Sequence, residues 1–143
     1  MTAMQFARHA AVALCLTLFA AAGFAQDKPA GQDYQPEVGQ AGKDVVWVPT
    51  SQALVDRMLE LGKLTPKDNH IDLGSGDGRT VITAAKRGAT SLGIEYNPDM
   101  VALSQRNAAK EGVSARAKFV KADLFETDFS QATLITLFLL PDI

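Results

Sequence analysis

Residues 72–78 read Asp-Leu-Gly-Ser-Gly-Asp-Gly, with three glycines at alternate positions directly after a short apolar stretch. Glycine tolerates positive φ, and because it has no Cβ it lets a ligand approach the backbone closely. The run therefore predicts a strand that ends in a tight loop against a bound small molecule.

The first 43 residues differ in character from the rest of the chain. Residues 1–25 carry one charged basic side chain, Arg8, then an apolar run with small residues before position 26, which is typical of a secretory signal cleaved after Ala25. An uncleaved membrane anchor and a misassigned start codon are the alternatives. We therefore expect a periplasmic or secreted protein, a membrane-anchored one if the segment is retained, or a cytoplasmic one if the start site is wrong. Residues 26–43, rich in Pro, Gly and polar residues, predict a flexible leader.

The remaining composition excludes several classes of protein. Residues 26–143 hold 13 Lys and Arg against 16 Asp and Glu, with no basic stripe, so we expect no nucleic-acid partner. The only cysteine, Cys15, lies in the signal, which excludes disulfides and cysteine metal sites from the rest of the chain. We expect one domain, residues 44–143, and no metal; the oligomeric state is left open.

Helical and strand signals alternate from residue 44 onward. Asn97 with Pro98 and Asp99 is a strong helix start. The last strand is nearly continuous in apolar and β-branched residues, so we expect it to be buried on both faces. The predicted helices are 51–61, 80–87 and 97–112, and the predicted strands are 70–73, 91–95, 118–122 and 132–140. This order predicts an α/β fold, a doubly wound parallel sheet with ligands at the carboxyl ends of its strands.

Three strand ends would then meet in one crevice, and each carries a group suited to a nucleoside. Glu95 is placed to accept hydrogen bonds from ribose hydroxyls, and Asp123 to accept one from an exocyclic adenine amine. The G-x-G-x-G spacing differs from the G-x-G-x-x-G of dinucleotide sites, which disfavours a nicotinamide-dependent oxidoreductase. Asp72 and Asp77 would repel a pyrophosphate but suit a cationic amine or sulfonium, so the spacing and charges favour S-adenosyl-L-methionine.

Three segments resemble the successive cofactor motifs of class I, seven-stranded S-adenosylmethionine-dependent methyltransferases: 72–79, 93–98 and 119–125. Val48-Pro-Thr50 and Leu137-Phe-Leu-Leu-Pro141 strengthen a closer resemblance, to lysine methyltransferases of the ATP-synthase c-subunit group and their bacterial relatives. The resemblance covers about residues 44–141. It implies a Rossmann-like fold and methyl transfer to a methyl acceptor, either a protein lysine or another amine.

Carried onto this sequence, the resemblance implies a role for ten residues. The glycines and Ser75 would line the methionine portion of the cofactor, and Asp72 and Asp77 would lie near its amino group. Glu95 would bind the ribose, and Asp123 with Leu124 would contact the adenine. The alternative explanations are a structural turn for the glycines, a solvated strand end for Glu95 and a turn cap before Phe125 for Asp123. Tyr96 is either a stacking partner or a surface residue. The implied cofactor-binding residues are Asp72, Gly74, Ser75, Gly76, Asp77, Gly78, Glu95, Tyr96, Asp123 and Leu124.

Methyl transfer asks for alignment and exclusion of water more than for a catalytic side chain, so no catalytic residue is predicted. We expect Arg79 to pack or form an ion pair, and His70 to begin a strand without a chemical role. The resembling fold has seven strands and this chain ends after the fourth. We therefore expect a fragment or truncated gene product that holds the cofactor half, with a non-catalytic binding module as the alternative. Candidates for the acceptor side are Trp47, Pro49, Thr50, Leu140 and Pro141.

Overall fold

The computed structural model describes residues 34–139, which form a four-stranded parallel sheet with the strand order β3-β2-β1-β4. The predicted signal at residues 1–25 lies outside the described residues. The strands are β1 (Asn69–Leu73), β2 (Thr90–Glu95), β3 (Ala117–Lys121) and β4 (Leu134–Leu137), and the helices are α1 (Gln52–Leu61), α2 (Arg79–Lys86) and α3 (Pro98–Lys110). The predicted α/β fold with a parallel sheet is confirmed.

Local sequence explains where the helices begin. The Ser51 hydroxyl accepts a hydrogen bond from the Leu54 N–H at 3.3 Å and caps α1. The Asn97 side chain accepts one from the Asp99 N–H at 2.9 Å, and proline occupies the first turn of α3. Helix α2 instead begins at Gly78, without a side-chain cap. The first N–H group of α2, that of Arg79, donates instead to Asp77 Oδ1 at 3.3 Å.

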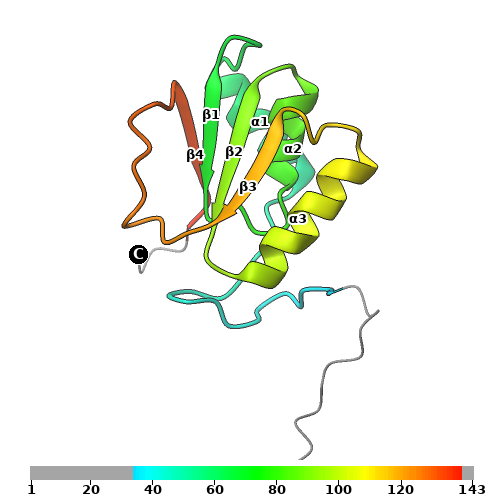
Figure 1. Cartoon of the computed structure of the whole chain (residues 1–143), viewed down its shortest axis with the longest axis vertical. Helices are drawn as coiled ribbons and strands as arrows, with labels where there is room; N and C mark the ends of the chain where they lie inside the picture. The colour runs from blue at the N-terminus through cyan, green and yellow to red at the C-terminus, as the bar shows by residue number, and fades with distance from the viewer. Residues whose placement is uncertain (1–33, 140–143) are drawn as a thin grey trace, which may run out of the picture. The chain divides into compact units, whose positions relative to one another are not determined.

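All three helices cover one face of the sheet, and the segment that joins β3 to β4 lies on the other (Figure 1). The helix-covered face holds the core residues Val55, Leu59, Val81, Ile82, Ala84, Ala85, Val101, Ala108, Ala117 and Phe119. The opposite face holds Ile71, Leu73 and Ile94, with Leu92, Ala122, Leu124 and Ala132 packed against them. Since side chains alternate along a strand, His70 and Asp72 of β1 point to the helix-covered face.

Strand β4 differs from its prediction. It spans Leu134–Leu137 rather than 132–140, and it lies at an edge of the described sheet. The Ile135 and Leu137 side chains are 39% and 54% exposed, because within residues 34–139 no helix covers their face. The expectation of burial on both faces is therefore wrong for the described part of the chain, and only Thr136 of this strand is buried.

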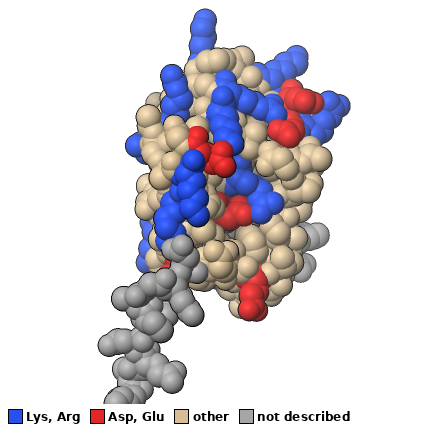
Figure 2. All heavy atoms as spheres, turned by 90° about the vertical axis from the view of Figure 1, so that its right-hand side faces the viewer, with Lys and Arg blue, Asp and Glu red and all other residues tan. Residues whose placement is uncertain are grey.

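Figure 2 shows Lys and Arg side chains over much of one face, with Asp and Glu side chains between them. Ion pairs neutralise part of this charge: Lys86 pairs with Glu111 at 2.5 Å and Arg87 with Asp56 at 2.7 Å. Among residues 34–139, no helix has the length and apolar character of a membrane span.

Candidate functional site

The glycine loop after β1 has the backbone conformation that its sequence predicts. Gly74, Gly76 and Gly78 have φ values of 75°, 53° and 85°, all in the region that side chains with a Cβ avoid. The N–H groups of Gly74 and Ser75 both donate to the Ile94 carbonyl at 3.0 Å. Alternate glycines therefore let the chain turn sharply while it stays attached to the end of β2.

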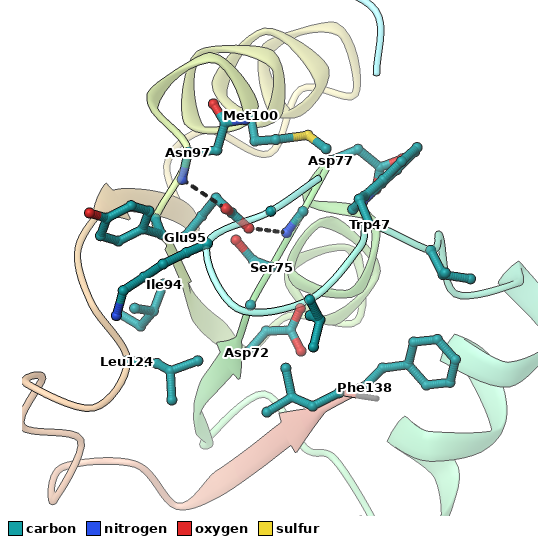
Figure 3. Close-up of a pocket in the computed structure, with 18 of the residues that line it drawn as sticks. Trp47, Asp72, Ser75, Asp77, Ile94, Glu95, Asn97, Met100, Leu124 and Phe138 are labelled. Carbon is teal, nitrogen blue, oxygen red and sulfur yellow. Dashed lines mark hydrogen bonds between the residues drawn. The ribbon is translucent and has the colours of Figure 1, made fainter. Parts of the chain in front are cut away.

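The Glu95 carboxylate ties this loop to the start of α3. Its Oε2 accepts from the Gly76 N–H at 2.9 Å and its Oε1 from the Asn97 N–H at 2.9 Å, as Figure 3 shows. A carboxylate has about four acceptor positions, so two bonds leave capacity for a ligand. Glu95 also lines the pocket, which is consistent with the predicted contact to ribose hydroxyls.

The two acids of the loop lie in different electrostatic surroundings. Asp77 accepts from the Arg79 guanidinium, with Nη2 to Oδ2 at 2.5 Å, and Arg79 also donates to the Thr50 carbonyl at 2.7 Å. Asp72 is buried and accepts from the Thr136 hydroxyl at 2.6 Å. Among the described residues Asp72 forms no ion pair. The predicted ion-pair role of Arg79 is observed, and the charge of Asp77 is compensated within the protein.

Burial raises the pKa of Asp72 from 3.8 to about 7. Hydrogen bonds from the Thr136 and Thr80 hydroxyls oppose this shift, and the charges of Glu95 and Asp77 reinforce it. A cation beside Asp72 would lower its pKa again, because an opposite charge favours the ionised form. The end of the pocket beside Asp72 is therefore suited to a cationic amine.

The opposite end of the pocket contains Asp123 and Tyr96. The Lys43 ammonium lies 2.5 Å from Asp123 Oδ2 and 5.2 Å from the centre of the Tyr96 ring. The hydrogen bonds with Lys43 and the Phe125 N–H lower the pKa of Asp123, which is therefore ionised. The Phe125 N–H donates to Asp123 Oδ1 at 3.0 Å, so the turn-capping contact is present beside the predicted adenine contact.

A hairpin over residues 39–47 forms a wall of the pocket that no sequence motif marks. The Trp47 N–H donates to the Gln40 carbonyl at 2.9 Å, and the Gly39 N–H donates to the Trp47 carbonyl at 2.8 Å. The Trp47 indole nitrogen would lie only 2.7 Å from a Cβ on Gly76, so the hairpin packs directly on the glycine loop. The predicted boundary between leader and domain, after residue 43, falls inside this hairpin.

One pocket brings most of the predicted residues together (Figure 3). Gly78 is not among its lining residues; it begins α2 and packs on Phe119 and Ser104. The acceptor-side candidates Trp47, Pro49 and Thr50 line the pocket, while residues 140 and 141 lie outside the described part of the chain. The predicted cofactor residues that line it are Asp72, Gly74, Ser75, Gly76, Asp77, Glu95, Tyr96, Asp123 and Leu124.

Lys43, Thr136, Met100 and Phe138 also belong to this site or contact it, and we did not predict them from sequence. Thr136 is the one polar residue between Leu134 and Leu139, which is a signal that could have marked it. Among residues 34–139 no cluster of His, Cys, Asp or Glu could hold a metal ion.

Several known proteins that this chain resembles are methyltransferases. An RNA methyltransferase from Salinibacter ruber, solved with S-adenosyl-L-homocysteine, is 50% identical, with a TM-score of 0.64 over 66% of this chain and 62% of its own. A protein-lysine N-methyltransferase from Saccharolobus islandicus is 44% identical over 69% of this chain and 63% of its own. The human ATP-synthase c-subunit lysine N-methyltransferase is 38% identical over 66% of this chain and 40% of its own.

The parallel sheet, the glycine loop and the carboxylates at the strand ends define a Rossmann-like methyltransferase domain. The family model of the ANTKMT methyltransferase domain matches residues 72–143, and the chain belongs to this family. The chain spans 63% or less of the length of these curated relatives.

Proposed function

We propose that the chain binds S-adenosyl-L-methionine in this pocket and acts in methyl transfer to a protein lysine or another amine. The observation that carries the proposal is the buried Asp72 carboxyl beside the glycine loop, without an ion-pair partner among the described residues. The lysine-methylating relatives from Saccharolobus and human support the choice of acceptor.

The residues present fit this cofactor. The Ser75 hydroxyl is buried without a hydrogen-bond partner in the described part of the chain, and its residue lines the pocket. Such a group is costly to leave unpaired, so a ligand oxygen or nitrogen is its expected partner. Asp72 would bind the amine of the methionine portion, Glu95 the ribose, and Asp123 with Leu124 the adenine.

The bound cofactor supplies an activated methyl group on a sulfonium, and the protein contributes position and exclusion of water. Trp47, Phe138 and Leu139 contribute apolar surface to the pocket. An acceptor lysine must reach this region as a neutral amine, which apolar surroundings favour because burial lowers the pKa of an ammonium group.

Isothermal titration of the full chain with S-adenosylhomocysteine tests cofactor binding. We expect saturable binding that is weakened at least about tenfold in Asp72→Asn, because the charged amine loses a charge-assisted partner. Glu126→Gln, an exposed carboxylate outside the pocket lining, is the matched control. Absence of binding by the unaltered chain would refute the proposal.

The Salinibacter relative is described as an RNA methyltransferase, which raises RNA as a second acceptor class. Incubation of the chain and tritiated S-adenosylmethionine with a cell lysate separates the two classes. Label that is removed by protease and retained after ribonuclease supports protein methylation. The reverse result would make the acceptor RNA and would contradict the expectation from charge that no nucleic acid binds.

We also propose that residues 1–25 export the protein. The basic start, the apolar run and the small residues before position 26 support this proposal. Cell fractionation with mass spectrometry of the amino terminus tests it, and we expect a periplasmic or secreted protein that begins at Gln26. A cytoplasmic protein that retains residue 1 would contradict export.

A further inference from the structure

A chain of four polar side chains crosses the sheet and ends in the pocket. Ser91 Oγ lies 2.6 Å from His70 Nδ1, and His70 Nε2 lies 2.8 Å from Thr136 Oγ1. Thr136 Oγ1 in turn lies 2.6 Å from Asp72 Oδ1. All four residues are buried, and of the four only Asp72 lines the pocket. His70 is therefore linked to the pocket through one hydroxyl.

The register of the sheet brings these residues together. His70 is the partner of Ser91 across the β1–β2 pair, and Asp72 is the partner of Thr136 across the β1–β4 pair. His70 and Asp72 are two residues apart on β1, so both point to the helix-covered face. All four side chains are buried, and Asp72 is the member that lines the pocket.

The protonation states of His70 and Asp72 determine which atom donates in each hydrogen bond between the four side chains. Burial lowers the pKa of His70 to about 4, so the ring is neutral and carries one N–H. An ionised Asp72 only accepts, so Thr136 must give it its single proton and must itself accept from His70 Nε2–H. The Ser91 hydroxyl then donates to Nδ1. With a neutral Asp72 that donates to Thr136, each bond reverses and the His70 proton lies on Nδ1.

We propose that His70, acting through Thr136, is a positioning residue for the amino-acid end of the cofactor. The four hydrogen-bonded side chains hold the Asp72 carboxyl toward the pocket. When a cationic amine arrives, their hydrogen bonds reverse together to the arrangement in which Thr136 donates to an ionised Asp72. The four side chains together lose one proton to solvent in this step: Asp72 becomes a carboxylate, the His70 ring proton is on Nε2 instead of Nδ1, and Ser91 and Thr136 each keep one hydroxyl proton. This inference rests on the proposed binding of S-adenosylmethionine.

Within residues 34–139, the charged groups that act on the two ends of the chain are acidic. Glu95 from β2 and Asp77 from the glycine loop act on Asp72, and Asp68 before β1 acts on His70. None of them supplies a positive charge to Asp72, which leaves the Thr136 and Thr80 hydroxyls and the arriving amine to stabilise its ionised form.

Two ligands and two variants of Thr136 test the positioning role. Thr136→Val keeps the shape and removes the hydroxyl, whereas Thr136→Ser keeps the hydroxyl. We expect Thr136→Val to weaken S-adenosylhomocysteine binding about tenfold and Thr136→Ser to restore it. Methylthioadenosine, which lacks the amino-acid portion, should bind both variants within about twofold of the unaltered chain. Equal weakening of both ligands would show a general loss of structure and would overturn the proposal.

Nitrogen-15 NMR of the histidine rings reports the tautomer directly. The chain has two histidines, His9 and His70, so His70→Gln assigns the signals. We expect His70 to carry its proton on Nε2 when S-adenosylhomocysteine is bound, and to shift toward Nδ1 in the free protein as the pH falls below about 7.

The outcomes separate this inference from the proposed function. If S-adenosylhomocysteine does not bind the unaltered chain, the proposed function fails. If it binds while the His70 tautomer is the same in the free and bound protein and across pH, the positioning role alone is refuted. The pH series on the free protein tests the coupling of His70 to Asp72 without any ligand.

Discussion

Lys43 reaches from the hairpin to the end of β3, where its ammonium lies 2.5 Å from the Asp123 carboxylate and 5.2 Å from the centre of the Tyr96 ring. Asp123 is the residue that we expect to contact the adenine, and Tyr96 is either a stacking partner of the cofactor or a surface residue. If Asp123 binds the exocyclic amine of the adenine as predicted, that amine and the Lys43 ammonium compete for the same carboxylate.

Replacing Lys43 with methionine should tighten cofactor binding. The ion pair is partly exposed, so we expect at most about a fivefold gain in affinity for S-adenosylhomocysteine at low salt, with a smaller gain at high salt. Titration calorimetry at two ionic strengths measures it, with the exposed Lys67→Met as control. Weaker binding would instead show that Lys43 holds the hairpin on the cofactor.

Replacing Asp72 with asparagine should stabilise the free protein at neutral pH. Below about pH 4 Asp72 is protonated in both states; between about pH 4 and 7 the folded protein keeps a proton that the unfolded chain releases, so stability falls as the pH rises. We expect the variant to gain up to about 4 kcal/mol above pH 7 and little below pH 4.

Urea unfolding across this pH range measures the difference between Asp72→Asn and the unaltered chain. His70 has the opposite dependence, because its pKa is lowered from 6.5 to about 4 and stability falls as the pH drops through that window. To first order this contribution is shared by both proteins and cancels in the comparison. A difference that does not grow between pH 4 and 7 would contradict the raised pKa of Asp72.

Replacing Glu95 with glutamine should loosen the glycine loop. The two N–H groups of Gly76 and Asn97 donate to different oxygens of Glu95, and a glutamine replaces one of these oxygens with an NH2 group, which cannot accept. We expect faster hydrogen exchange at one of these two amides and a loss of about 1–3 kcal/mol in stability. Glu126→Gln is again the control, and unchanged exchange at both amides would contradict the arrangement.

Two glycines separate backbone strain from steric conflict. Gly78 and Gly112 both have positive φ, 85° and 69°. A Cβ on Gly112 meets nothing within 4 Å, whereas a Cβ on Gly78 lies 2.8 Å from both Phe119 and Ser104. We expect Gly112→Ala to cost about 1–2 kcal/mol and Gly78→Ala about 1–3 kcal/mol more. Equal costs in urea unfolding would mean that the core beside Gly78 adjusts freely.

Local patterns predicted the elements well because their causes are local. The alternate glycines require positive φ, Asn97 with Pro98 starts a helix, and apolar periodicity marks the helix faces. The short range of these effects also explains why the predicted burial of β4 on both faces is wrong. Burial of β4 depends on what covers each of its faces, and the exposed Leu137 shows that its own composition does not decide this.

The sequence by itself determined the class of this protein, its glycine loop and the carboxylates at its strand ends, because each depends on residue type and spacing along the chain. Tertiary structure alone decided that Lys43 reaches Asp123 and that His70 is joined to Asp72 through Thr136. These contacts join residues through strand register and hairpin packing. No spacing along the chain encodes them, because they arise only when β1, β2, β4 and the hairpin are brought together.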